Sequence, residues 1–163
     1  MIKKGKELAE YLKAKKVVIV AGELCNKIEF DGKRLLDYAV EISNKLGDPI
    51  AGAGNTTIAL KEKGAKSVRK MWAIELMNYM RWPWEQEKEH PPIMDKKPEV
   101  LLLIGYSAPV AQGLVSTVKA GDGETVVLGS TYVESATYSF PDSSSLKQWE
   151  MNLKKLIESL ERN

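Results

Sequence analysis

Four short apolar runs, each followed directly by a glycine, dominate the hydrophobic pattern of this chain. The runs cover residues 17–21, 49–51, 100–104 and 125–128, and the glycines are Gly22, Gly52, Gly105 and Gly129. None of the runs alternates with polar residues, which is typical of strands covered on both faces. Helical patterns lie between the runs, so we predict parallel strands joined by crossover helices. We expect one domain over 1–163 with a three-layer, Rossmann-like α/β fold, its mostly parallel sheet carrying helices on both faces.

The segments between the runs carry the start and stop signals of helices. We expect helices over about 4–15, after Asp31 as an N-cap, from about residue 55 to Gly64, after Ser67 and Ser107 as caps, and from about Ser144. Gly47 is well placed to end the second of these in a left-handed conformation. The apolar face of the helix after Ser67 would consist of Val68, Met71 or Trp72, Leu76 and Tyr79. Residues 130–143 are polar, and we expect them to be irregular.

The four glycines are expected to share one edge of the sheet, because ligands of parallel sheets bind beyond the carboxyl ends of the strands. Glycine at that edge allows close approach of a ligand or a positive φ. The segment 52–57, Gly-Ala-Gly-Asn-Thr-Thr, is the best phosphate candidate, because free amides at a helix N-terminus favour an anion. Thr57 replaces the third glycine of the dinucleotide fingerprint. A tight turn capped by Asn55 or Thr56 is an equally good interpretation.

Two later turns follow the same logic. Ser107, after the third run, either caps a helix or holds a ligand oxygen. The segment 129–132, after the fourth run, either closes over an adenosine or is an ordinary exposed loop. The candidate cofactor-binding residues are Gly22, Glu23, Gly52, Gly54, Asn55, Thr56, Gly105, Tyr106, Ser107, Gly129, Ser130 and Thr131.

The sequence predicts no catalytic residue and no metal ligand. Cys25 follows the first run, and a small buried thiol is the favoured interpretation over a nucleophile, which needs a neighbouring base. With one cysteine and one histidine, His90, the chain cannot by itself build a four-thiolate iron–sulfur or zinc site. The carboxylates Glu23, Asp31 and Glu75 show no spacing that predicts acid–base catalysis.

Composition narrows the class of protein. The chain has 163 residues with 24 lysines and arginines against 22 aspartates and glutamates, and this balance gives no argument for a nucleic-acid partner. No apolar stretch approaches the roughly 20 residues that span a bilayer, so we expect no membrane partner. The single cysteine favours a reducing compartment. We therefore expect a cytoplasmic protein.

Residues 82–98 interrupt the helical pattern with tryptophans, prolines and a run of charges. They contain Trp82-Pro83-Trp84, an acidic stretch ending at His90, then Pro91-Pro92 and Pro98. Prolines argue against a regular element here, and long loops in compact domains are often functional. Together with Trp72 and Tyr79, the tryptophans either anchor a partner or cover one edge of the sheet.

An ordered set of segments in the second half of the chain resembles a known family. The set comprises Glu75-Leu76-Met77-Asn78-Tyr79, a tryptophan-bearing loop, Pro98 before the run 100–104 and Gly105, Gln112-Gly113-Leu114 with Ser116 and Lys119, Tyr138-Ser139-Phe140-Pro141-Asp142, and Trp149. From about 68 to 160 these segments look like the epsilon subunit of the archaeal carbon monoxide dehydrogenase/acetyl-CoA decarbonylase/synthase complex. The first half is similar to the domains shared by deoxyhypusine synthase, sirtuins and thiamine-diphosphate enzymes, on the segments 14–22 and 46–51.

The resemblance implies a non-catalytic accessory subunit in one-carbon metabolism and methanogenesis. Its expected partner is the large (alpha) carbon monoxide dehydrogenase subunit, which carries the nickel–iron–sulfur clusters, and contacts between copies of the chain are also expected. The resemblance further implies bound flavin, FAD, for electron transfer. The chain departs from the family pattern at 82–98, which is richer in proline and acidic residues, and at the hydrophilic turn 120–124.

Two alternatives remain open from the sequence. The glycine edge is also compatible with a free-standing nucleotide-binding protein of the deoxyhypusine synthase or sirtuin type, although the zinc tetrad of sirtuins and a recognisable reactive lysine are missing. The other alternative is a structural module that self-associates through the tryptophan loop and the apolar stripe of the last helix. Calorimetry with FAD, FMN, NAD and CoA tests the nucleotide-binding premise that the subunit and the free-standing hypotheses share.

Overall fold

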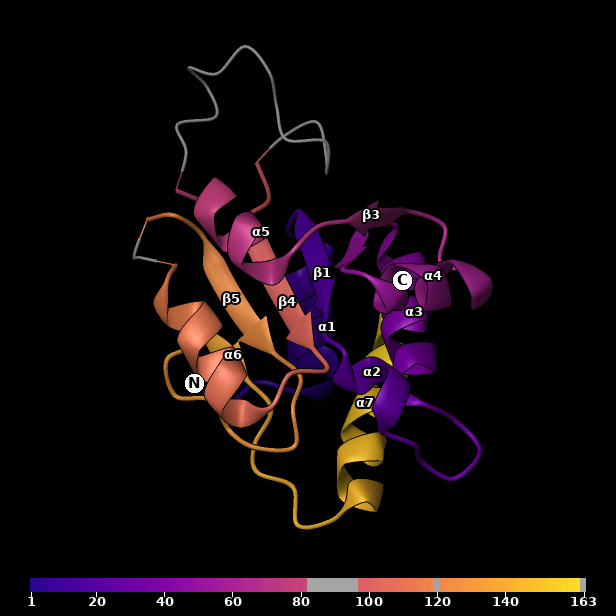
Figure 1. The fold of residues 1–163 in the computed structure, drawn as a ribbon. Coiled ribbons are helices and arrows are strands. Elements are labelled where there is room, and N and C mark those ends of the chain that lie inside the picture. The colour runs from indigo at the N-terminus through magenta and orange to yellow at the C-terminus, as the bar shows by residue number, and fades with distance from the viewer. Residues whose placement is uncertain (82–96, 119–120, 162–163) are drawn as a thin grey trace.

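The sheet of the computed structural model has six strands, all parallel, in the order β3-β2-β1-β4-β5-β6 (Figure 1). The structure describes residues 1–81, 97–118 and 121–161. The strands are β1 (Val17–Ala21), β2 (Ile50–Gly52), β3 (Val68–Lys70), β4 (Val100–Ile104), β5 (Glu124–Val127) and β6 (Tyr138–Ser139). The predicted α/β Rossmann-like class is confirmed, and no described strand runs antiparallel in the sheet.

The central pair of strands, β1 and β4, is the longest and most buried part of the sheet. The two strands pair over five residues, from Val17 opposite Val100 to Ala21 opposite Ile104. Every residue of both strands is buried, because helices cover both faces and other strands cover both edges. This explains why the two runs are apolar throughout rather than at every second position.

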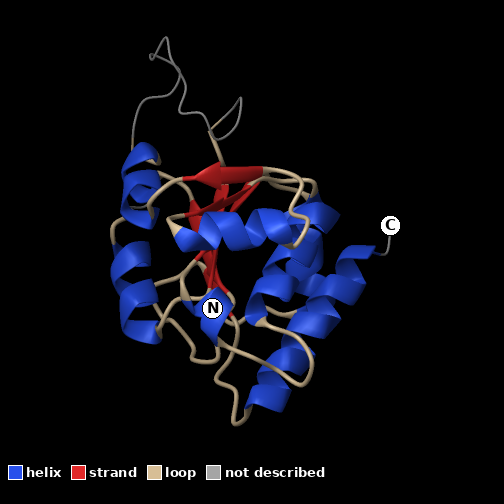
Figure 2. Ribbon diagram, turned by 45° about the vertical axis from the view of Figure 1, so that its right-hand side comes forward, coloured by secondary structure: helices blue, strands red, loops and turns tan. Residues whose placement is uncertain are grey.

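Helices cover the sheet on both sides, as Figure 2 shows with the sheet seen nearly edge-on. One face packs against α1 (Gly5–Lys13), α2 (Leu24–Lys27), α3 (Leu35–Leu46), α4 (Asn55–Glu62) and α7 (Leu146–Glu161), and the other against α5 (Ala73–Tyr79) and α6 (Ala108–Ser116). Successive residues of β1 serve opposite cores: Val17 and Ile19 face the first group, and Val18 and Val20 the second. This alternation is the period of a β-strand.

Two edge strands were not predicted. Ser67 does not cap a helix, because Val68–Lys70 is β3, paired in register with Ile50–Gly52, and α5 begins only at Ala73. Likewise the segment expected to be irregular contains β6, which pairs with β5 at Val126 and Val127. Both strands are short and only partly buried, so neither shows the continuous apolar run of a central strand.

The start of α3 also differs from the expected start. Asp31 is not its N-cap: α3 begins at Leu35, the N-cap is Arg34, and the Arg34 amide donates to Asp37 Oδ2 at 2.8 Å. The carboxylate in the first turn therefore does the capping. Gly47 ends α3 with φ 74°, as predicted. The short helix α2 was not predicted from the sequence.

The N-terminal segment extends the sheet beyond β6. Ile2 forms a parallel bridge with Ser139, and the Ser139 amide donates to the Met1 carbonyl at 2.9 Å. Helix α7 lies along α1 and α3 (Figure 1). Its predicted apolar stripe is buried at Trp149, Leu153, Leu156 and Leu160, whereas Leu146, also predicted to belong to it, is 56% exposed. Within the described ranges, no helix is both long and apolar enough to cross a membrane.

Candidate functional site

A cavity of about 460 Å³ opens where the strand order reverses, at the carboxyl ends of β1 and β4. The connection after β1 runs toward one edge of the sheet and the connection after β4 runs toward the other. A crevice therefore forms between the two connections. Residues after β1, β2, β3 and β4 line it, together with the first residues of α5 and α6. Its volume lies within the range of roughly 300–1,000 Å³ that small-molecule sites have.

Most of the predicted binding residues surround this cavity. Its lining includes Gly22, Glu23, Gly54, Thr56, Gly105, Tyr106 and Ser107. Gly52 and Asn55 adjoin the lining residues in the chain without contributing to it. Gly129, Ser130 and Thr131 line a smaller hollow of about 80 Å³, which shares Tyr106 and Ser107 with the larger cavity. The predicted set thus lies at one edge of the sheet but divides between two neighbouring hollows.

At Gly22 and Gly105 the glycines are required by the protein's own backbone. A Cβ on Gly22 would lie 2.3 Å from the Gly105 carbonyl oxygen, and one on Gly105 would lie 2.5 Å from Cys25 Sγ. The two turns are joined by hydrogen bonds from the Gly22 amide to Ile104 O at 2.8 Å and from the Leu24 amide to Gly105 O at 3.1 Å. Tight packing between the ends of β1 and β4 therefore explains these two glycines without a ligand.

Gly54 is different, because it lies at the start of α4 with open space beside it. Its φ is 57°, and nothing lies within 4 Å of where a Cβ would be. Among the described residues, none accepts a hydrogen bond from the amides of Gly54 and Asn55. These amides lie at the positive end of an eight-residue helix. This turn is the part of the lining best suited to a phosphate group.

The cavity lining is nearly uncharged. Glu23 is its single charged residue among those described, and its side chain is exposed. Burial raises the pKa of the Tyr106 phenol, with a smaller contribution from Cys25, so Tyr106 stays neutral and acts through its hydroxyl and ring. Such a lining binds a ligand through hydrogen bonds, helix dipoles and apolar contacts.

Cys25 is a buried structural thiol, as predicted. It is fully buried, and its Sγ donates to the Ile104 carbonyl at 3.5 Å. Burial raises its pKa from 9.0 to about 12, so the reactive thiolate is suppressed near neutral pH. In the described part of the chain, no three histidine, cysteine, aspartate or glutamate side chains are grouped as metal ligands would be.

Sequence reasoning missed the contribution of the β3–α5 turn to the site. Met71 and Trp72 line the cavity, and the Trp72 side chain is 68% exposed at its mouth. Val110, in the first turn of α6, also lines it and is 50% exposed. Recognising Val68–Lys70 as a strand would have predicted Met71 and Trp72 as site residues. Trp82, Trp84 and His90 lie outside the described residues.

The fold and cavity together define a Rossmann-like α/β domain with a ligand-sized crevice at the switch point of its sheet. The sequence matches no protein-family model, and a search of curated proteins gives no match either.

Proposed function

We propose that this chain is a non-catalytic accessory subunit of a carbon monoxide dehydrogenase/acetyl-CoA decarbonylase/synthase complex, where it binds the large metal-cluster subunit and a flavin nucleotide. The observation that carries the proposal is the nearly uncharged switch-point cavity with an exposed apolar mouth. The ordered resemblance over residues 68–160 supports the particular complex. A reducing, cytoplasmic setting follows from the same assignment.

The residues of the cavity fit the phosphate and ring portions of a flavin nucleotide. The free amides at Gly54 and Asn55 suit a phosphate. The exposed indole of Trp72 offers a face on which an aromatic ring can stack. Glu23 suits a ribose hydroxyl, which donates to a carboxylate. A bound flavin would supply one- and two-electron redox chemistry, while the chain's own residues bind it, orient it and exclude water.

The mouth of the cavity has the character of a protein-binding surface. Trp72, Ile74 and Val110 are 68%, 51% and 50% exposed and come from the start of α5 and the first turn of α6. Exposed aromatic and aliphatic side chains around a cavity are typical of binding surfaces. A large subunit docked here would cover the nucleotide and bring it close to the partner's clusters.

Affinity purification tests the partner. The tagged chain, isolated anaerobically from its native organism, is expected to recover a large nickel–iron–sulfur protein. Ile74→Asp, which does not alter a cavity-lining residue, is expected to weaken this recovery at least about tenfold, since it places a charge in an apolar contact. Met151→Asp is the matched control, because Met151 is 46% exposed on α7, on the other face of the sheet. Recovery of the chain alone would overturn the proposed complex.

Calorimetry tests the cofactor independently. FAD or FMN is expected to bind the isolated chain more tightly than NAD or CoA, and Trp72→Ala is expected to weaken binding about tenfold through loss of stacking. No binding of any of the four would remove the flavin while leaving the subunit assignment intact.

The alternative function is that of a free-standing nucleotide-binding protein of the deoxyhypusine synthase-like group. It is favoured by one observation: the strand order and the switch-point cavity are complete within this single chain. This alternative predicts nucleotide binding with no partner recovered, whereas the subunit assignment predicts recovery of the partner.

A further inference from the structure

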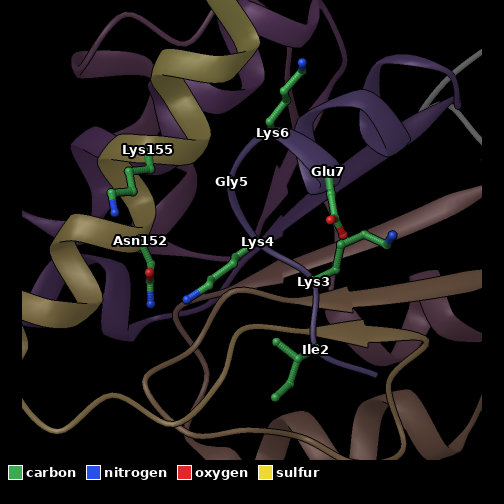
Figure 3. Close-up of a pocket in the computed structure, with 8 residues that line it drawn as sticks. All are labelled: Ile2, Lys3, Lys4, Gly5, Lys6, Glu7, Asn152 and Lys155. Carbon is green, nitrogen blue, oxygen red and sulfur yellow. The ribbon is translucent and has the colours of Figure 1, made fainter.

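A second hollow, of about 440 Å³, lies at the start of α1 and carries a concentration of positive charge (Figure 3). Residues 2–7 form one side, and Asn152 and Lys155 of α7 form the other. The segment that forms its first side is tied to β6 through the hydrogen bond from the Lys3 amide to Ser139 O, at 3.1 Å. The hollow shares no lining residue with the switch-point cavity.

The environment of the Asn152 side chain is the observation that points to a ligand. Its side chain lines the hollow and is only 8% exposed, yet none of its polar atoms has a hydrogen-bond partner among the described residues. The hydrogen-bonding capacity of this amide is therefore available to a group bound in the hollow. In Figure 3 the ammonium groups of Lys4 and Lys155 lie on either side of this amide.

The backbone at the start of α1 adds unpaired donors. Lys4 makes no side-chain cap, and the first amide to bond within the turn is that of Leu8, to Lys4 O at 3.4 Å. The four preceding amides, residues 4–7, have no acceptor in the part of the chain that the structure describes. They lie at the positive end of a nine-residue helix.

The lysines of the hollow are not equivalent. Lys3 Nζ lies 4.5 Å from the centre of the Tyr138 ring, and Lys6 Nζ lies 3.9 Å from Glu10 Oε1. Lys4 and Lys155, by contrast, have no ion pair within the described ranges. Glu7 is the one acidic residue of the lining, and Figure 3 shows it on the side of Lys4 away from Asn152.

We propose that this hollow binds a phosphate group, held by the amides at the start of α1, by the ammonium groups of Lys4 and Lys155, and by the amide nitrogen of Asn152. All of these groups donate hydrogen bonds or carry positive charge, and a phosphate has oxygens enough to accept from several of them at once. The phosphate comes either from free inorganic phosphate or from a phosphate ester such as a nucleotide.

Nuclear magnetic resonance of the ¹⁵N-labelled full chain tests the site. Titration with inorganic phosphate is expected to shift the amide signals of Gly5, Lys6 and Glu7 saturably. Lys4→Ala and Lys155→Ala are each expected to weaken binding about tenfold, as loss of one charge-assisted hydrogen bond does. Asn152→Asp keeps the side-chain size but adds a negative charge, and is expected to abolish binding.

Lys147→Ala is the matched control, since Lys147 is an exposed lysine of α7 outside the hollow. If it weakens binding as much as Lys155→Ala does, phosphate responds only to overall charge and the site is overturned. Absence of saturable shifts at Gly5–Glu7 in the native chain overturns it as well.

AMP distinguishes the two sources of the phosphate. Tighter binding of AMP than of phosphate, with shifts at Gly5–Glu7, identifies an ester, and equal affinities identify the free ion. AMP shifts confined to Gly54 and Gly105, with no response of Gly5–Glu7 to either compound, place phosphate binding in the switch-point cavity alone and overturn the proposal.

Discussion

Individual glycines at the carboxyl edge of the sheet have different physical reasons for being glycine. Gly22 and Gly105 face one another across the β1–β4 junction, where a side chain would collide with backbone. At Gly129 an added Cβ would have its nearest contact at 3.7 Å, an ordinary van der Waals distance, so a methyl group is tolerated there. Gly54 alone combines a positive φ with open space beside the cavity. A glycine after a strand is therefore weak evidence for a ligand until its surroundings are known.

Gly22→Ala is expected to destabilise the protein by at least about 2 kcal/mol, because the added methyl group must displace the Gly105 carbonyl. Urea unfolding measures the change in the free energy of unfolding. Gly129→Ala is the control and is expected to change it by less than about 0.5 kcal/mol. Equal losses from both substitutions would show that the contact with Gly105 is not what fixes Gly22.

The Cys25 thiol predicts a loss of stability at high pH. Its pKa is raised by burial to about 12 in the folded protein and is near 9.0 when exposed. The unfolded chain therefore loses this proton first, so the stabilisation is complete below about pH 9 and declines as the pH rises toward 12. The expected slope is at most about 1.4 kcal/mol per pH unit. Unfolding of Cys25→Ala, measured over the same range, should lack this part of the slope; identical slopes would contradict the prediction.

At the scale of elements, continuous apolar runs predicted the central strands well and the edge strands poorly. The runs 17–21 and 100–104 correspond to β1 and β4 residue for residue, because burial on both faces leaves no polar position. β3 reads Val-Arg-Lys and is partly exposed, so its pattern cannot be told from the start of a helix. An edge strand such as β3 forms because it pairs with a neighbouring strand, and this pairing cannot be predicted from the local sequence alone.

Helices α3 and α7 are joined by a buried hydrogen bond whose loss is measurable. The Tyr38 hydroxyl donates to Glu150 Oε2 at 2.5 Å, and both residues are buried. Tyr38→Phe leaves the carboxylate without this donor and is expected to reduce the free energy of unfolding by about 1–3 kcal/mol. Adding Glu150→Met removes the buried carboxylate that has lost this donor, and the double variant is expected to recover part of the loss in thermal or urea unfolding. A double variant less stable than Tyr38→Phe would contradict this reasoning.

At the scale of the whole molecule, the sequence predicted the edge of the sheet at which the proposed residues gather. It did not predict that they would divide between two hollows. The seven proposed residues that line the larger cavity follow three of the four runs. The separation of Gly129–Thr131 into its own hollow depends on how Tyr106 and Ser107 pack between the two, which only the folded chain determines. Trp72 entered the site because β3 is a strand, so the missed element and the missed residue have one cause.

The position of each strand in the sheet predicts its protection from hydrogen exchange. β1 and β4 have strands on both sides and helices on both faces, so their amides are expected to exchange slowest, at the rate of global unfolding. Amides of β3 are expected to exchange at least about tenfold faster, because it is an edge strand of three residues. Native-state exchange followed by magnetic resonance measures both. Comparable rates for β3 and β4 would show that the sheet opens only as a unit.

The pairing of β1 with β4 also sets a demand on how this chain folds. These neighbours meet over five residue pairs, yet Val17 and Val100 lie far apart in sequence, with the helices α2 to α5 and the strands β2 and β3 between them. The centre of the sheet can form only after the long segment between the two strands closes into a loop. The entropy lost on this closure is not compensated by contacts until the strands are aligned. Refolding should therefore be slow for a domain of this length, with the two halves collapsing separately before the middle of the sheet joins them.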